Sequence, residues 1–219
     1  MAGSPTPKRA RAVRESSAVP KETLAQLVAA KRSKQLELLK WPSDVWATWF
    51  ASPRLSLIQT TNFVVSKSPM STLYEMDLKH VFSVDMLVER IQEDGHRIAL
   101  SVNATSDANL FLYANKDVYE EWDIDTTDMP IEDNQIDGGL DPALYRFVAP
   151  SRDQVKLFIA KVQDVLSEDA LVMIHVASAF GYNRSGTLIC SFLIEHGKKT
   201  LKEALNVFAQ SRPPGRFVL

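Results

Sequence analysis

Cysteine is almost absent from this chain of 219 residues, and its absence limits the chemistry that the chain can perform. Cys190 is the single cysteine, so an intramolecular disulfide is excluded and a reducing compartment is favoured. It lies on the apolar side of an expected helix, which predicts a core residue rather than a nucleophile. No cysteine–histidine cluster has the spacing of a zinc site, and we expect neither a metal nor a cofactor.

Long apolar runs are absent as well. None approaches the roughly 20 residues that a membrane-spanning helix needs, and the polar, basic N-terminus does not resemble a secretory signal. The sequence has 45% hydrophobic and 24% charged residues, which is typical of a globular domain with a sizeable core. We therefore expect no membrane partner.

Acidic residues are scarce only in the first 40 positions. Residues 1–40 hold 9 Lys or Arg and 3 Asp or Glu, a net charge of +6, whereas the rest of the chain carries −8. This split predicts a basic arm on an acidic domain. The run Lys8–Arg14 could be a nuclear-entry signal, an RNA-contacting arm or a solvated tail. Nuclear localisation is therefore the first expectation, and cytoplasmic the alternative.

The residue pattern divides the chain into three parts. Residues 1–22, with prolines and serines around the basic run, are expected to be a disordered arm. Residues 23–60 are expected to be a helical extension rich in tryptophan, whose Trp41, Trp46 and Trp49 either anchor it by packing or stack on bases. Residues 61–219 alternate strand and helix signals. They predict an α/β domain with a central, mostly parallel sheet flanked by helices.

Local signals place the elements of the third part. Strands are expected over residues 61–67, 97–103 and 171–176. Helices are expected after Ser83 or Asp85, after the capping box Ser151–Gln154 and after the capping box Thr200–Glu203. Residues 122–131 suit an edge strand or extended loop, and residues 136–150 suit a long polar loop.

The most informative stretch is residues 172–190, in which a buried strand runs through a tight loop into a helix. Such a loop directs several backbone N–H groups at one point beside the positive end of the helix dipole. Arg184 stands at the start of the helix, where its guanidinium can hold two oxygens of one phosphate. The stretch therefore predicts a phosphate-binding loop at the carboxyl end of a central strand.

This loop resembles that of cysteine-dependent phosphatases, in which His-Cys is followed by five residues, Arg and then Ser or Thr. Arg184-Ser185 sets the register. The runs Phe180-Gly-Tyr-Asn-Arg-Ser-Gly-Thr and Phe208-Ala-Gln-Ser-Arg-Pro-Pro-Gly resemble the RNA 5′-triphosphatase domain of animal- and plant-type mRNA-capping enzymes. The resemblance covers about residues 60–215 and implies a protein-tyrosine-phosphatase-like fold.

Two positions depart from that family. Its catalytic cysteine is Ser178 here, and the histidine before it is Ala177. A thiol is readily ionised in such a loop, whereas a serine hydroxyl needs a base. His175 lies three residues before Ser178, and strand alternation does not direct it at the hydroxyl. We expect an intact phosphate loop with absent or very slow chemistry. Two adjacent changes favour a natural loss over an engineered substrate trap.

The resemblance also implies roles for the other loop residues. The backbone N–H groups of residues 179–184 and the Arg184 side chain would hold the phosphate, and Ser185 would stabilise a leaving thiolate. The phosphate-binding residues are Ala179, Phe180, Gly181, Tyr182, Asn183 and Arg184. The protein-phosphatase branch adds an aspartate as general acid. Asp133 is the candidate for that role here, with Asp128 as second choice.

Three functions remain open at this point. The first is removal of the γ-phosphate from 5′-triphosphate RNA in mRNA capping, or an inactive remnant of that activity. A separate guanylyltransferase would then be a partner, because the Lys-x-Asp-Gly motif of that enzyme does not occur here. The second is a dual-specificity protein phosphatase relative. The third is a non-catalytic pseudophosphatase that binds phosphate ends, RNA ends or a partner protein.

Overall fold

The computed structural model describes residue 49 and the ranges 51–69, 82–105, 116–129 and 149–212. Several predictions therefore lie outside the described residues: the basic arm over 1–22, the helix over 23–40, Trp41 and Trp46. Asp133 and nearly all of the polar loop over 136–150 lie outside them as well.

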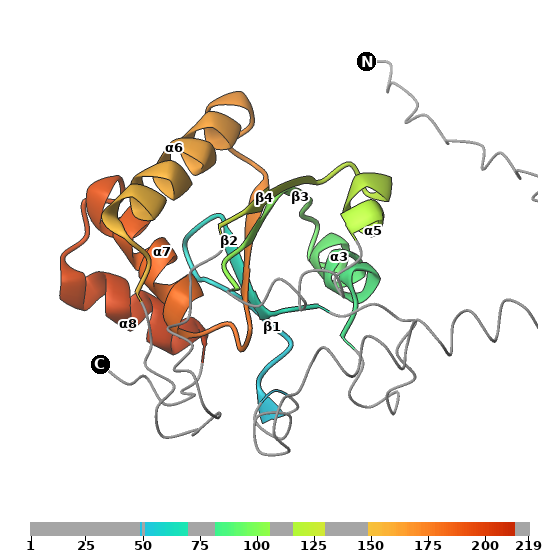
Figure 1. Cartoon of the computed structure of the whole chain (residues 1–219), viewed down its shortest axis with the longest axis horizontal. Coiled ribbons are helices and arrows are strands. Elements are labelled where there is room, and N and C mark those ends of the chain that lie inside the picture. The colour runs from blue at the N-terminus through green and yellow to red at the C-terminus, as the bar shows by residue number, and fades with distance from the viewer. Residues whose placement is uncertain (1–48, 50, 70–81, 106–115, 130–148, 213–219) are drawn as a thin grey trace, which may run out of the picture.

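A five-stranded sheet forms the centre of the fold (Figure 1). Its strands, in chain order, are β1 (Leu55–Leu57), β2 (Phe63–Lys67), β3 (Ile98–Asn103), β4 (Asp125–Asp128) and β5 (Met173–Ser178). The spatial order is β1-β2-β5-β3-β4. Strand β1 pairs with β2 antiparallel, and the other neighbours are parallel. The mostly parallel sheet confirms the predicted α/β class and places β5 at its centre.

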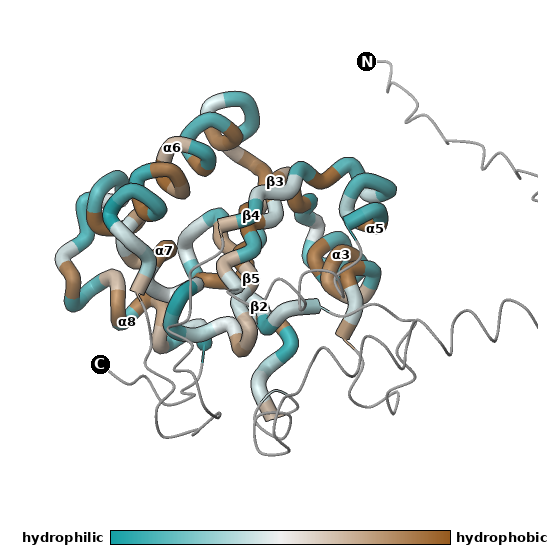
Figure 2. The backbone as a smooth tube through the Cα atoms, viewed as in Figure 1, coloured by the Kyte–Doolittle hydropathy of each residue, from teal (hydrophilic) through white to brown (hydrophobic). Residues whose placement is uncertain are grey.

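Helices cover both faces of this sheet (Figure 1). They are α3 (Val84–Glu93), α5 (Lys116–Glu121), α6 (Arg152–Glu168), α7 (Asn183–Glu195) and α8 (Leu201–Ser211). Helices α6, α7 and α8 gather on one face, and α3 and α5 on the other. Each helix presents hydrophobic and hydrophilic positions in turn along the chain, as the alternating colours of Figure 2 show. The hydrophobic side of each helix is therefore available to cover the sheet.

Each face of the sheet has its own hydrophobic core, because successive strand residues point to opposite sides. Val65 and Val176 pack with Phe158 of α6 and Phe208 of α8. Val64, on the opposite face, packs with the apolar side of α3. Cys190 of α7 belongs to the first core, and burial raises the pKa of its thiol to about 11. This confirms the prediction that Cys190 is a core residue.

Three of the helix starts follow the predicted capping chemistry. The Ser151 hydroxyl accepts a hydrogen bond from Gln154 N, while the Gln154 side chain accepts one from Ser151 N. Thr200 and Glu203 form the same reciprocal pair at α8. At α3 the cap is Ser83 rather than Asp85, because the Ser83 hydroxyl accepts from Met86 N. These motifs involve residues three apart, so the sequence alone reveals them.

The segment before residue 61 contributes to the sheet, which the sequence did not predict. Strand β1 lies within residues 23–60 and pairs with β2 through Leu55 and Ser66. Trp49 is fully buried in the core beneath α3, which confirms packing for this tryptophan. The domain boundary at residue 61 itself stays a prediction. None of the described helices is long and apolar enough to cross a membrane.

Candidate functional site

The candidate site is the loop between β5 and α7, at the carboxyl end of the central strand. Gly181 has a φ of 70°, a conformation that residues with a Cβ rarely adopt. A Cβ at this position would also overlap the backbone carbonyl of Ser66, at the end of β2. Glycine is therefore required here both for the turn and for the close approach of the loop to β2. The loop therefore lies directly against the end of β2.

Ser178, the position of the family's nucleophile, forms the floor of this loop. The residue is 4% exposed. Its Oγ accepts two hydrogen bonds, one from Gly181 N at 3.2 Å and one from the Ser185 hydroxyl at 2.9 Å. Two donors converging on one atom favour negative charge on that atom. The surroundings of position 178 therefore suit a thiolate better than a neutral hydroxyl.

The start of α7 supplies the other groups that the sequence predicted. Arg184 lies in the first turn, and burial lowers the pKa of its guanidinium to about 10, so it stays charged at neutral pH. Tyr182 precedes the helix without forming a side-chain cap. Backbone N–H groups of the first turn are the usual anion-binding groups of a helix. Ser178 thus ends β5, Gly181 lies in the loop, and Arg184 and Ser185 lie in the first turn of α7. Their roles in phosphate binding stay predictions.

His175 does not act on Ser178. It is fully buried between neighbouring strands, where Nε2 lies 2.7 Å from the Ser66 hydroxyl and Nδ1 lies 2.8 Å from the Ser101 hydroxyl. Burial lowers the pKa of the imidazole to about 3, so it is neutral at physiological pH. The expectation from strand alternation is therefore confirmed: His175 links β2, β5 and β3, and it supplies no base to the loop.

The direction of these hydrogen bonds follows from the number of hydrogens. The Ser66 hydroxyl donates its single hydrogen to Lys67 O at 2.7 Å, so His175 Nε2 must be the donor to Ser66. Nδ1 then accepts from the Ser101 hydroxyl, and a side-chain hydrogen bond joins Ser101 to Tyr119. Every polar group in this buried chain has a partner. The imidazole therefore has no free nitrogen with which to remove a proton from Ser178.

The two acid candidates have different outcomes. Asp133 lies outside the described residues. Asp128 ends β4, two strands away from β5, and forms an ion pair with Lys116 at 2.6 Å. Its other carboxylate oxygen accepts from the Asn103 side chain at 3.2 Å. Asp128 is thus occupied by two neighbours in this arrangement and does not contact the loop through any of these bonds.

The sequence reasoning assigned no role to Arg212, which contacts the loop from behind. It follows α8 and is 0% exposed. Its Nη2 donates to Phe180 O at 3.0 Å and to Pro53 O at 2.9 Å. The guanidinium also lies 4.9 Å from the centroid of the Tyr182 ring. The only signal in the sequence was that Arg212 opens the Arg-Pro-Pro-Gly run, and the structure gives a physical reason for an arginine there.

The arrangement can bind an anion, but none of the contacts of Ser178 in the described part of the chain would activate its hydroxyl. Backbone amides of the loop and the charged Arg184 side chain in the first turn of α7 are the groups that can attract an anion. Ser185 donates to Ser178 and is not a base toward it. Within the described ranges, no group of three or more His, Cys, Asp or Glu side chains could hold a metal ion.

Known structures share this fold. The active form of Tk-PTP superimposes with a TM-score of 0.51 at 20% identity, covering 74% of this chain and 86% of that one. PTPMT1 in complex with PI(5)P gives a TM-score of 0.51 at 11% identity, covering 72% and 83%. At these identities the comparison establishes the fold alone. The chain therefore has the predicted protein-tyrosine-phosphatase-like fold.

Sequence comparisons add a relationship over shorter segments. A family model described as "Tc-R-P: Polymorphic toxin system, DSP-PTPase phosphatase" matches residues 128–198, less than half of the chain. The mRNA-capping enzyme of Danio rerio is 33% identical over 68 residues, and that of Mus musculus is 34% identical over 68 residues. Each match covers 31% of this chain and 11% of the relative, so it spans about a tenth of those proteins. Together the matches support a relationship to the cysteine-phosphatase superfamily of the dual-specificity type, with partial similarity to mRNA-capping enzymes.

Proposed function

We propose that this chain is an RNA 5′-triphosphatase-type domain that binds the phosphate end of RNA and, with serine at position 178, turns it over at most at a trace rate. The observation that carries the proposal is the environment of Ser178 Oγ, which accepts hydrogen bonds from Gly181 N and the Ser185 hydroxyl. Those donors would stabilise a thiolate. They leave a hydroxyl protonated, since no base contacts it among the residues that the structure describes.

The loop retains groups that can bind phosphate, although it lacks the nucleophilic cysteine. The Arg184 guanidinium and the amides of the first turn of α7 would hold the oxygens of the terminal phosphate. Gly181 keeps the loop close to β2, and Arg212 supports it from behind. A bound phosphate would thus find positive charge and N–H donors already in place. Binding should survive the loss of the nucleophile.

The choice of RNA over protein rests on sequence similarity. The partial match to mRNA-capping enzymes favours a 5′-triphosphate end, as do the Gly-Tyr-Asn-Arg-Ser-Gly and Arg-Pro-Pro-Gly runs. A guanylyltransferase would then act on the diphosphate end. A dual-specificity protein phosphatase is the second candidate function, because the matching family model describes a DSP-PTPase phosphatase. A pseudophosphatase that only binds is the third.

Restoring the nucleophile tests these alternatives. The double variant Ala177→His, Ser178→Cys should release γ-phosphate from 5′-triphosphate RNA in the presence of a chelator. In that reaction the thiolate forms an S–P bond to the γ-phosphorus, and the P–O bond to the β-phosphate breaks. Diphosphate-ended RNA leaves, and water then hydrolyses the phosphoenzyme. The parent chain, measured in parallel, should give no more than a trace of phosphate.

The outcomes separate the three functions. Preference of the double variant for triphosphate RNA over a phosphotyrosine peptide supports the RNA reading, and the reverse preference supports a protein phosphatase. A folded double variant with no activity on either substrate, but with intact anion binding, supports a binding module.

Calorimetry with tungstate provides the binding control. Arg184→Ala should weaken tungstate binding about 100-fold or more, because it removes the bidentate charge-assisted contact. Equal binding by this variant would exclude the loop as the anion site.

A further inference from the structure

Two buried cations lie at the carboxyl end of the sheet, next to the loop. Lys67 ends β2 and is 2% exposed, and its Cα is the register partner of Ser178 across the β2–β5 pair. Its Nζ donates to Trp49 O at 2.8 Å and lies 3.9 Å from the centroid of the Trp49 ring. Arg212 is the second cation. A Cβ built on Gly181 would stand 2.6 Å from Arg212 Nη2, so this guanidinium touches the turn of the loop itself.

Neither cation is neutralised by a carboxylate in the part of the chain that the structure describes. Lys67 contacts a carbonyl oxygen and an aromatic ring. The Arg212 side chain contacts two carbonyl oxygens, the Ser56 hydroxyl at 3.3 Å and the Tyr182 ring, while its buried Nε has no hydrogen-bond partner. All of these acceptors are neutral. Within the described ranges, the two positive charges therefore have only neutral partners, and both side chains are buried.

Burying charge in this way opposes folding, because each ion loses its hydration without gaining an opposite charge. The cost is visible in the pKa of Lys67, which burial, together with the nearby charges of Arg54 and Arg212, lowers to about 8. Burial lowers the pKa of Arg212 to about 10. Both groups nevertheless stay mainly protonated at neutral pH. The hydrogen bonds of Arg212 to Phe180 O and Pro53 O have a structural role, but a hydrophobic side chain in place of Lys67 would avoid much of this cost.

We propose that Lys67 and Arg212 form a rear cation pair that makes the loop select ligands by negative charge, favouring a di- or triphosphate end over a single phosphate. The proposal rests on the proposed function, in that the loop must bind phosphate. The energy of a ligand in the field of a fixed charge grows in proportion to the charge of the ligand. Burial protects this field from screening by salt. The pair acts through the loop and does not contact the ligand.

The test compares two anions on the full chain. Calorimetric titrations with inorganic phosphate and with tripolyphosphate, at neutral pH and low salt, give the ratio of the two dissociation constants. Lys67→Met removes one charge while keeping a long side chain, and should lower the preference for tripolyphosphate about tenfold. Arg212→Lys keeps the charge but loses the forked contacts, and should retain most of the preference. Arg97→Gln removes a cation at the opposite end of the sheet and should leave the ratio unchanged.

A second readout covers the case in which the parent chain binds no anion, which would refute the proposed function by itself. In the background Ser178→Cys, the ultraviolet absorbance of the thiolate reports the pKa of the introduced thiol. Adding Lys67→Met should raise that thiol pKa, and adding Arg97→Gln should not. Arg212→Gln offers an independent neutralisation if Lys67→Met does not fold. An unchanged affinity ratio, or an unchanged thiol pKa, in a folded charge-removing variant would overturn the rear cation pair.

Discussion

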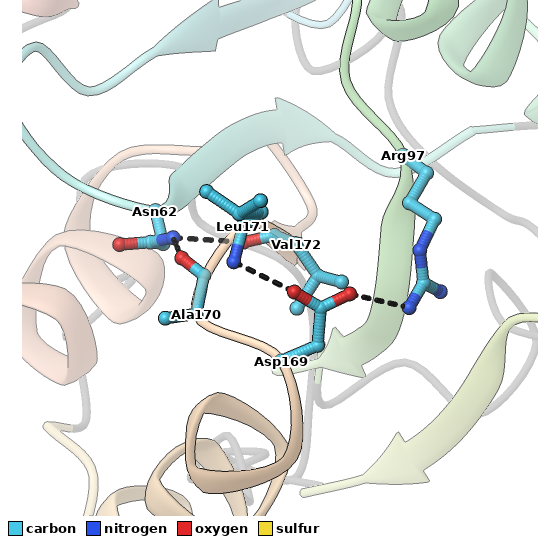
Figure 3. A network of polar contacts seen from close by, with 6 residues as sticks. All are labelled: Asn62, Arg97, Asp169, Ala170, Leu171 and Val172. Atoms are coloured by element: carbon cyan, nitrogen blue, oxygen red, sulfur yellow. Dashed lines mark hydrogen bonds and ion pairs between the residues drawn. The ribbon is translucent and has the colours of Figure 1, made fainter. Parts of the chain in front are cut away.

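Charged side chains have different surroundings at the two ends of strand β5. At the amino end, Arg97 and Asp169 form an ion pair at 2.9 Å, and their side chains are 59% and 38% exposed. The other Asp169 oxygen accepts from Leu171 N, and the Asn62 side chain donates to Ala170 O and Val172 O (Figure 3). Charges at this end are paired and hydrated. At the carboxyl end, Lys67 and Arg212 are buried against neutral groups.

This difference indicates what each end contributes. Exposed ion pairs add little to the free energy of unfolding. The polar turn that leads into β5 at its amino end is therefore expected to contribute little to stability. The carboxyl end retains buried positive charge that a purely structural edge would avoid. Substitutions at the two ends should therefore have different effects, and three experiments test this expectation.

The largest expected effect comes from a pair of glycines. Gly181 and Gly95 both have positive φ, at 70° and 80°. A Cβ on Gly181 would collide with the Ser66 backbone, whereas a Cβ on Gly95 would meet nothing within 4 Å. Gly181→Ala should lower the free energy of unfolding by roughly 3 kcal/mol and abolish anion binding. Gly95→Ala should lower it by about 1 kcal/mol and leave binding intact.

Denaturant unfolding and tungstate calorimetry on both variants provide the measurement. Equal losses of stability would mean that backbone conformation alone sets the cost, and that the contact between the loop and β2 contributes nothing. Retained tungstate binding in Gly181→Ala would mean that the loop tolerates displacement. Either result would remove the distinction between Gly181, packed against β2, and the unpacked Gly95.

The next effect is a loss of stability in mild acid that comes from His175. Burial lowers its pKa in the folded state to about 3. Between about pH 6.5 and pH 3, the unfolded chain therefore binds a proton at His175 and the folded chain does not. Stability is therefore fully present above about pH 6.5 and declines as the pH falls toward 3. The expected loss by pH 5 is about 2 kcal/mol.

The exposed carboxylate at the amino end titrates in a different window. Hydrogen bonds from Leu171 N and Arg97 lower the pKa of Asp169 below its usual value, so its contribution is lost only at more acidic pH. His175→Gln should be less stable than the parent at pH 7, yet should show a flatter profile between pH 6.5 and 4. Chemical denaturation across that range checks this. A profile as steep as that of the parent would assign the acid loss to other groups.

The smallest effect is expected for the exposed ion pair. Arg97→Gln should change the free energy of unfolding by less than about 1 kcal/mol, because solvent screens the pair and Asp169 keeps its bond to Leu171 N. Tungstate affinity should not change. Thermal melts and calorimetry suffice for both readouts. A large loss of stability would show that the Arg97–Asp169 ion pair contributes substantially to the free energy of unfolding, contrary to this expectation.

The features that the sequence revealed are those encoded by near neighbours in the chain. The capping boxes at Ser151 and Thr200 involve residues three apart, and the strand–loop–helix order around Ser178 lies within about 20 residues. The orientation of His175 away from the Ser178 hydroxyl followed from strand alternation. The fold class followed from the alternation of elements. All of these depend on local conformational preferences and on the side-chain period of each element.

The features that remained hidden depend on distant parts of the chain. Arg212 lies 32 residues from Phe180 and 159 from Pro53, and nothing in its neighbourhood predicts either contact. Lys67 reads as a charged residue at the end of a strand, where exposure is the ordinary expectation. It is buried in the structure, where the Trp49 ring lies over its Nζ. The short strand β1 carries too few residues for a clear alternation.

Arg212 is synthesised after the loop that it contacts, so the site cannot be complete until residue 212 has been made. The strand, the loop and α7 are made before α8, yet Phe180 O gains its rear contact only when residue 212 is in place. The same side chain holds Pro53 O, from the segment before β1. On the ribosome the loop therefore stays without this support until the last turn of α8 has emerged. A nascent chain stalled before that point would present the Gly181-Tyr-Asn-Arg184 sequence without its rear contact.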